Sequence, residues 1–139
     1  MANNPEEVSR PSDNNPKLGL KIRSLSGNEY PENNETIVLI DTGYDGEVIL
    51  PLTIYHNLNL NLWEEPEKDE FMTPEGKDID FLVSRGYIII PKLGNNQYPV
   101  EIHTASDSTQ DIGEVIVGIK FIKRFKLLLD CPASKVMIL

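Results

Sequence analysis

The residues with the clearest potential for chemistry are Asp41, Thr42 and Gly43, which directly follow the four apolar residues 37–40. A carboxylate after such a run lies at the end of a buried strand, where the loss of solvent disfavours its charged form. An acid in this place is costly unless another group pairs with it or the protein uses it. Thr42 adds a hydroxyl, and Gly43 permits a tight turn. Asp41 is therefore a candidate functional acid, although the triplet by itself favours an ordinary turn at a strand end, because Asp, Thr and Gly are all common turn residues.

The elements that must position Asp41 are short strands. Leu18, Leu20 and Ile22 alternate with Gly19 and polar residues, as in a half-buried strand, and the run 37–40 favours a strand buried on both faces. Further strands are predicted at residues 47–50, 71–90 (a long hairpin turning at 73–76), 98–102, 115–117, 127–130 and 136–139, and short helices at 51–58 and 119–125. Many short strands with two short helices predict a closed or sandwich-like all-β fold.

The first part of the chain has a different composition from the rest. Residues 1–16 contain three prolines and four asparagines and almost nothing apolar. Such a segment buries too little apolar surface to offset the entropy of ordering. We therefore expect a disordered tail over residues 1–16 and one domain over residues 17–139.

The segment from Ile37 to Pro51 resembles the active-site segment of retropepsin-like aspartic proteases. It is most similar to the prokaryotic single-domain members, whose motif reads Asp-Thr-Gly-aromatic, then a Gly and a Leu-Pro. Three further landmarks follow in the family's order: Leu58-Asn59-Leu60 after the short helix, Thr73-Pro74-Glu75-Gly76 at the flap tip, and Val115-Ile116-Val117-Gly118-Ile119 before a helix and the strand 127–130. The resemblance covers about residues 18–139. It implies a retropepsin-like closed β-barrel, the acid-protease fold, with one or two short helices and a flap hairpin.

The number of active-site motifs constrains the assembly. Aspartic-protease chemistry needs two carboxylates that share a proton, one acting as base on a water and the other as acid. Only Asp41 combines the apolar run with Asp-Thr-Gly, since Asp111-Ile112-Gly113 lacks the hydroxyl and follows polar residues. A homodimer with twofold symmetry supplies the second Asp41. We therefore expect an aspartic endopeptidase that is active as a homodimer on a peptide or protein substrate.

The resemblance also implies roles for the residues of the loop. Asp41 of each subunit would activate the water and protonate the leaving amine. Thr42 would hydrogen-bond across the dimer axis, and Gly43 would turn its carbonyl toward the substrate backbone. Tyr44, which replaces a small residue of the retroviral members, and Asp45 would contact the substrate. Asp45 fits equally well a simple Asp-Gly turn with the glycine that follows it.

The flap and the segment after Gly118 complete the comparison. Pro74, Glu75 and Gly76 would form the flap tip that covers the bound peptide and excludes water. Ile119 stands where retroviral members carry an arginine, so the ion pair made by that arginine is expected to be absent.

Composition excludes several other functions. The chain has 13 Lys and Arg against 22 Asp and Glu, and a net charge of −9, so we expect no nucleic-acid or membrane partner. The absence of a signal-peptide pattern and the single Cys131 favour a cytoplasmic location. His56 and His103 are far apart and have no metal-ligand spacing around them, so no metal or other cofactor is expected.

Two other functions also fit the sequence. One is a non-catalytic retropepsin-like module for dimerisation or peptide binding, because Tyr44 and Pro74 could close the cleft. The other is a generic β-barrel binding domain in which Asp-Thr-Gly is only a turn. The place of Asp41 in the fold and the oligomeric state distinguish these possibilities.

Overall fold

The computed structural model describes residues 6–9, 17–63, 69–72, 78–94, 96–106, 112–125, 127–130 and 135–138. Strand β2 (Lys17–Ser24) follows the predicted alternation. Its residues Leu18, Leu20 and Ile22 are buried, while Lys21 and Arg23 lie half-buried on the other face. One face of β2 therefore belongs to the core and the other to the surface.

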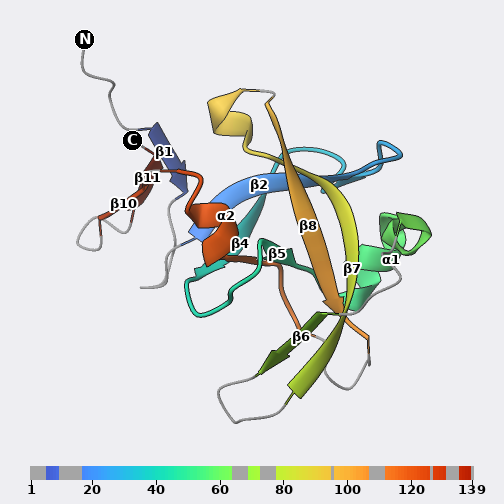
Figure 1. The fold of residues 1–139 in the computed structure, drawn as a ribbon. Coiled ribbons are helices and arrows are strands. Elements are labelled where there is room, and N and C mark those ends of the chain that lie inside the picture. The colour runs from blue at the N-terminus through green and yellow to red at the C-terminus, as the bar shows by residue number, and fades with distance from the viewer. Residues whose placement is uncertain are drawn as a thin grey trace.

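Six strands form a closed ring (Figure 1). Around the ring they are β2, β4 (Thr36–Asp41), β9 (Ile116–Gly118), β5 (Val48–Ile49), β8 (Gln97–Ala105) and β7 (Asp78–Ile89). A pairing of β7 with β2, with Lys21 opposite Ile89, closes the ring. Strand β3 (Glu29–Tyr30) extends the sheet beside β2. This closure confirms the predicted all-β barrel.

The core fills the inside of this ring with apolar side chains from every one of its strands. The members are Leu18, Leu20, Ile22, Val38, Ile40, Val48, Leu50, Tyr55, Leu58, Leu60, Ile88, Ile90, Val100, Ile102, Val115, Val117 and Phe121. Tyr55 comes from α1 (Leu52–Asn57), Leu60 from the 3₁₀ helix η1 (Leu60–Trp63) and Phe121 from α2 (Ile119–Ile122). A further 3₁₀ turn, η2 (Pro91–Leu93), joins β7 to β8. The two short α-helices begin where the sequence predicts them.

The predicted flap hairpin is present. Strand β6 (Asp69–Met72) pairs antiparallel with the first part of β7, from Asp69 opposite Phe81 to Met72 opposite Asp78. The hairpin projects from the lower edge of the barrel in Figure 1. The tip residues Pro74, Glu75 and Gly76 lie outside the described residues.

Strand β4 differs from the prediction that both its faces are buried. Val38 and Ile40 are buried, but Ile37 is 50% exposed and Leu39 is half-buried. The reason is the closed barrel, which takes only alternate residues of each strand into its interior. The apolar run at residues 37–40 therefore predicts the strand correctly, but the prediction that its outward-facing side chains are buried is wrong.

The beginning of the chain also differs from the prediction. Strand β1 (Glu6–Ser9) pairs with β11 (Lys135–Ile138), which pairs with β10 (Leu127–Asp130). This three-stranded sheet lies beside the barrel, at the left of Figure 1. The expected disorder of residues 1–16 is therefore wrong for residues 6–9, because pairing satisfies backbone groups whatever the side-chain composition. None of the described helices is long and apolar enough to cross a membrane.

Candidate active site

Asp41 is the last residue of β4, where that strand leaves the barrel. Strand β4 runs parallel to β9, with Asp41 opposite Gly118. The Oδ1 atom of Asp41 accepts a hydrogen bond of 2.9 Å from the backbone N–H of Gly43, and its carbonyl accepts one of 3.2 Å from Tyr44. The half-buried carboxylate is thus held by its own turn. The structure places Asp41 at a strand end, as the sequence predicts.

The residues that follow Asp41 lie at the surface. Thr42, Gly43 and Asp45 are all exposed. A Cβ atom added to Gly43 would lie only 3.2 Å from Oδ1 of Asp41, so a larger residue would press on the carboxylate. The turn therefore presents an accessible hydroxyl and an accessible backbone next to a carboxylate of fixed orientation.

The side chain of Tyr44 turns back toward the barrel. Its Oη lies 2.9 Å from Nδ1 of His103 and donates to the carbonyl of Val48 at 3.3 Å. Its ring covers Gly46, where an added Cβ would lie 2.8 Å from Cε1 of Tyr44 and closer still to the hydroxyl. These contacts tie the Asp41 turn to β8. Tyr44 also stays half-buried, so its contact with substrate stays a prediction.

His103 is a residue of this site that sequence reasoning missed. It is 1% exposed, and its ring lies edge-on to Tyr44 and to Phe81, with centroids 6.2 and 6.0 Å apart. Phe81 belongs to β7 where that strand pairs with β6. His103 thus contacts both the Asp41 turn and the base of the flap. No sequence signal connects it with Tyr44, which is 59 residues away.

Gly118 explains why the segment after Val117 must carry a glycine. Its N–H donates to the carbonyl of Glu47 at 2.9 Å, and the next N–H, of Ile119, donates to the carbonyl of Tyr44 at 2.9 Å. A Cβ atom on Gly118 would lie 2.5 Å from the Tyr44 carbonyl oxygen and even closer to that of Gly46. The two backbones therefore approach each other too closely for any side chain.

An ion pair links α2 to the segment after the turn. Nη2 of Arg124 pairs with Oε2 of Glu47, whose residue is only 4% exposed. The other oxygen of Glu47 accepts the N–H of Glu101 at 3.2 Å, and the guanidinium lies 5.6 Å from the Phe121 ring centroid. The expectation of a missing ion pair holds only for position 119. Arg124, five residues later, makes a partly buried pair of its own.

Other predicted residues are separate from this site. His56 is exposed on α1, and the described part of the chain contains no cluster of His, Cys, Asp and Glu that could hold a metal ion. Cys131 and the flap tip at Pro74, Glu75 and Gly76 fall outside the described residues, so the roles expected of the tip stay predictions.

Known proteins resemble this chain in sequence and in fold. No protein-family model matches the chain. An uncharacterised protein of Archaeoglobus fulgidus is 30% identical over 121 residues, which cover 86% of this chain and 84% of that protein. The chain belongs to the same family as this Archaeoglobus protein. The crystal structure of a retropepsin-like aspartic protease from Rickettsia conorii matches with a TM-score of 0.54 and 16% identity, over 86% of this chain and 88% of that one. This likeness shows the retropepsin-like fold.

Proposed function

We propose that the chain is an aspartic endopeptidase that acts as a homodimer. One observation carries the proposal: within a retropepsin-like fold, Asp41 stands at the end of β4 with its carboxylate held by the Gly43 N–H. The neighbouring exposed residues leave this end of the strand accessible to a second copy and to a substrate. A substrate that is a peptide or protein, and a cytoplasmic location, are parts of the same proposal.

In the proposed reaction the two Asp41 carboxylates of the dimer share one proton. The ionised carboxylate takes a proton from a water molecule, whose oxygen attacks the carbonyl carbon of the peptide bond. The protonated carboxyl then gives its proton to the amide nitrogen as the carbon–nitrogen bond breaks. Because Oδ1 of each Asp41 already accepts the Gly43 N–H, we assign Oδ2 to the exchange of protons with the water and the amide nitrogen.

The remaining predicted residues serve substrate and assembly in this proposal. Thr42 hydrogen-bonds to its counterpart across the dimer axis, and the Gly43 carbonyl and Asp45 face the substrate backbone. Pro74, Glu75 and Gly76 close over the bound peptide from the flap. Tyr44, whose side chain turns toward the barrel, holds the turn in place through its contact with His103.

The test is cleavage of a quenched fluorescent peptide library from acidic to neutral pH, comparing the parent chain with Asp41→Asn. The asparagine keeps an oxygen that can accept the Gly43 N–H, so the turn survives while the acid is lost. We expect cleavage to fall to background, and we expect Glu114→Gln, an exposed carboxylate elsewhere, to leave it unchanged. Cleavage that survives Asp41→Asn contradicts the proposal. A dimeric parent chain that cleaves nothing supports the non-catalytic module instead.

A further inference from the structure

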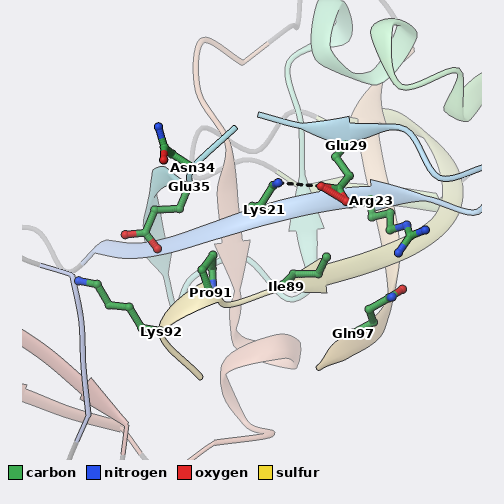
Figure 2. A pocket seen from close by; sticks show the side chains of 9 residues that line it. All are labelled: Lys21, Arg23, Glu29, Asn34, Glu35, Ile89, Pro91, Lys92 and Gln97. Atoms are coloured by element: carbon green, nitrogen blue, oxygen red, sulfur yellow. Dashed lines mark ion pairs between the residues drawn. The ribbon is translucent and has the colours of Figure 1, made fainter. Parts of the chain in front are cut away.

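A pocket of about 690 Å³ opens on the outer face of the barrel, and no residue of the Asp41 turn lines it (Figure 2). Its charged side chains carry both signs, with Lys21, Arg23 and Lys92 against Glu29 and Glu35. Lys21 and Glu29 already pair with each other at 2.7 Å. Such a lining selects no class of ligand. The side chain whose position does suggest a function is His103, which is buried on the outer face of β8.

His103 belongs to a small cluster outside the core of the barrel. Its neighbour Ile102 faces the core, so His103 points to the opposite side of β8. There it lies opposite Ile49 of β5 and Val83 of β7 in the strand register. We name the buried residues on this side the outer cluster: Ile49, Phe81, Val83, His103 and Ala105. His103 is the polar member of an otherwise apolar set.

A buried polar side chain in apolar surroundings is costly unless it is hydrogen-bonded. His103 meets this need at Tyr44. The single hydroxyl hydrogen of Tyr44 is donated to the carbonyl of Val48 at 3.3 Å, so Nδ1–H of His103 is the donor to Oη at 2.9 Å. This hydrogen bond joins the outer cluster to the end of the Tyr44 side chain.

The ring of Tyr44 cannot move independently of the Asp41 turn. Two glycines bound its opposite edges, since an added Cβ would lie 2.6 Å from Cδ2 at Gly118 and 2.8 Å from Cε1 at Gly46. The backbone N–H of Tyr44 donates to the carbonyl of Asp41 at 3.2 Å. The N–H of Gly43, which holds Oδ1 of Asp41, lies within the same turn. A displacement of the ring is therefore passed to the carboxylate.

The outer cluster also contains the base of the flap. Phe81 is opposite Asp69 in the pairing of β7 with β6, where the flap hairpin begins. Its ring meets the His103 ring edge-on, with centroids 6.0 Å apart. A movement of the hairpin about its base would press Phe81 against His103 or withdraw it.

We propose that His103 is a positioning residue, which passes the position of the flap from Phe81 to Tyr44 and so to Asp41. The inference rests on the proposed function and deepens it: closure of the flap over a substrate orients the acid that acts on that substrate.

Cleavage kinetics test the positioning role, with the fluorescent peptide that the parent chain cleaves fastest. His103→Leu removes the Nδ1–H donor. We expect kcat to fall about tenfold or more and KM to stay within about twofold, because His103 acts through Asp41 and does not contact the substrate. His103→Asn places an amide N–H near the position of Nδ1 and should restore kcat to within about threefold of the parent value. An unchanged kcat in folded His103→Leu overturns the proposal.

The amide resonance of Gly43 reports the same link without any cleavage, because this N–H donates to Oδ1 of Asp41. Nuclear magnetic resonance of the isotope-labelled full-length chain measures it. We expect His103→Leu to shift this resonance and His103→Asn to shift it less. Phe81→Leu should shift it in the parent chain, but not in a chain that already carries His103→Leu, because the link to Tyr44 is then broken.

Phe125→Leu is the matched control, because it removes ring contacts with Phe121 and Tyr98 instead. It should leave the Gly43 resonance unchanged in both backgrounds. A Gly43 resonance that Phe81→Leu leaves in place, or shifts equally in both backgrounds, overturns the coupling to the flap.

The two measurements separate this inference from the proposed function. If the parent chain cleaves no peptide while the Gly43 shifts follow the expected pattern, the proposed function fails and the link between flap and turn stands. If His103→Leu does not fold, Tyr44→Phe removes the same hydrogen bond from its other partner and takes its place in both measurements.

Discussion

The hydrogen bond between Tyr44 and His103 joins the Asp41 turn to β8. The two atoms lie 2.9 Å apart, and His103 is buried. The backbone N–H of Tyr44 also donates to the carbonyl of Asp41, and the carbonyl of Tyr44 accepts the N–H of Ile119. The same residue therefore contacts β4, α2 and β8. A buried hydrogen bond of this kind stabilises the fold only modestly, but its removal leaves a buried polar group without one of its partners.

The first prediction concerns Tyr44→Phe. The change keeps the ring on Gly46 and removes only the hydroxyl, so we expect the free energy of unfolding to fall by about 1 to 2 kcal/mol. Urea unfolding measures this. Tyr87→Phe, at another half-buried tyrosine on β7, is the matched control and should change stability by less than about 0.5 kcal/mol. Equal effects of both changes would mean that the His103 contact does not stabilise the turn.

At the scale of elements, β9 and the segment after β4 pack backbone against backbone at Gly118. We expect Gly118→Ala to destabilise the fold by about 1 to 3 kcal/mol, because the added methyl meets two carbonyl oxygens that belong to the turn. If the proposed function holds, cleavage should fall as well, since the turn carries Asp41. Thermal unfolding of Gly118→Ala beside Gly113→Ala measures the effect, because nothing lies within 4 Å of a Cβ at Gly113. Similar melting temperatures for the two variants would contradict the prediction.

The pair of Glu47 and Arg124 holds α2 against the same segment. Arg124→Met should cost about 2 to 3 kcal/mol, less than the roughly 3 to 5 kcal/mol for breaking a fully buried pair, because the arginine side chain is 35% exposed while the Glu47 side chain is 5% exposed. Adding Glu47→Gln should recover part of this loss, since the buried charge is then gone. Lys120→Met, in a largely exposed pair with Glu101 at 3.9 Å, should cost less than about 1 kcal/mol. Urea unfolding of the parent chain, Arg124→Met, the Arg124→Met and Glu47→Gln double variant, and Lys120→Met measures these differences in the free energy of unfolding.

The elements of this fold follow closely from local patterns, and their partners do not. Alternation at Leu18, Leu20 and Ile22 predicted β2, and Pro51 predicted the start of α1, because both signals are local. The outer face of β4 and the pairing of residues 6–9 depend on strands far along the chain. The same holds at the candidate site. Asp41 could be placed at a strand end from its neighbours alone, whereas His103 contacts Tyr44 across 59 residues and Arg124 pairs with Glu47 across 77.

At the scale of the whole molecule, the barrel carries one Asp-Thr-Gly turn, and the proposed chemistry needs two carboxylates. A twofold axis beside the exposed Thr42 and Gly43 would bring two copies of Asp41 together. The charge of −9 on each chain opposes association at low salt, so the proposed dimer would have to gain its stability from contacts that are specific to this face. Activity should therefore depend on assembly as much as on Asp41 itself.

Mixing subunits tests this dependence directly. When an equal amount of Asp41→Asn is equilibrated with the parent chain, random pairing places about half of the parent subunits in mixed dimers that hold a single acid. We expect the cleavage rate per parent chain to fall to about half, and to fall further with more variant. The same amount of variant added immediately before the assay, before subunits exchange, should leave the rate unchanged. An unchanged rate after equilibration, with exchange verified by mass-tagged subunits, would show that each chain acts without a second Asp41.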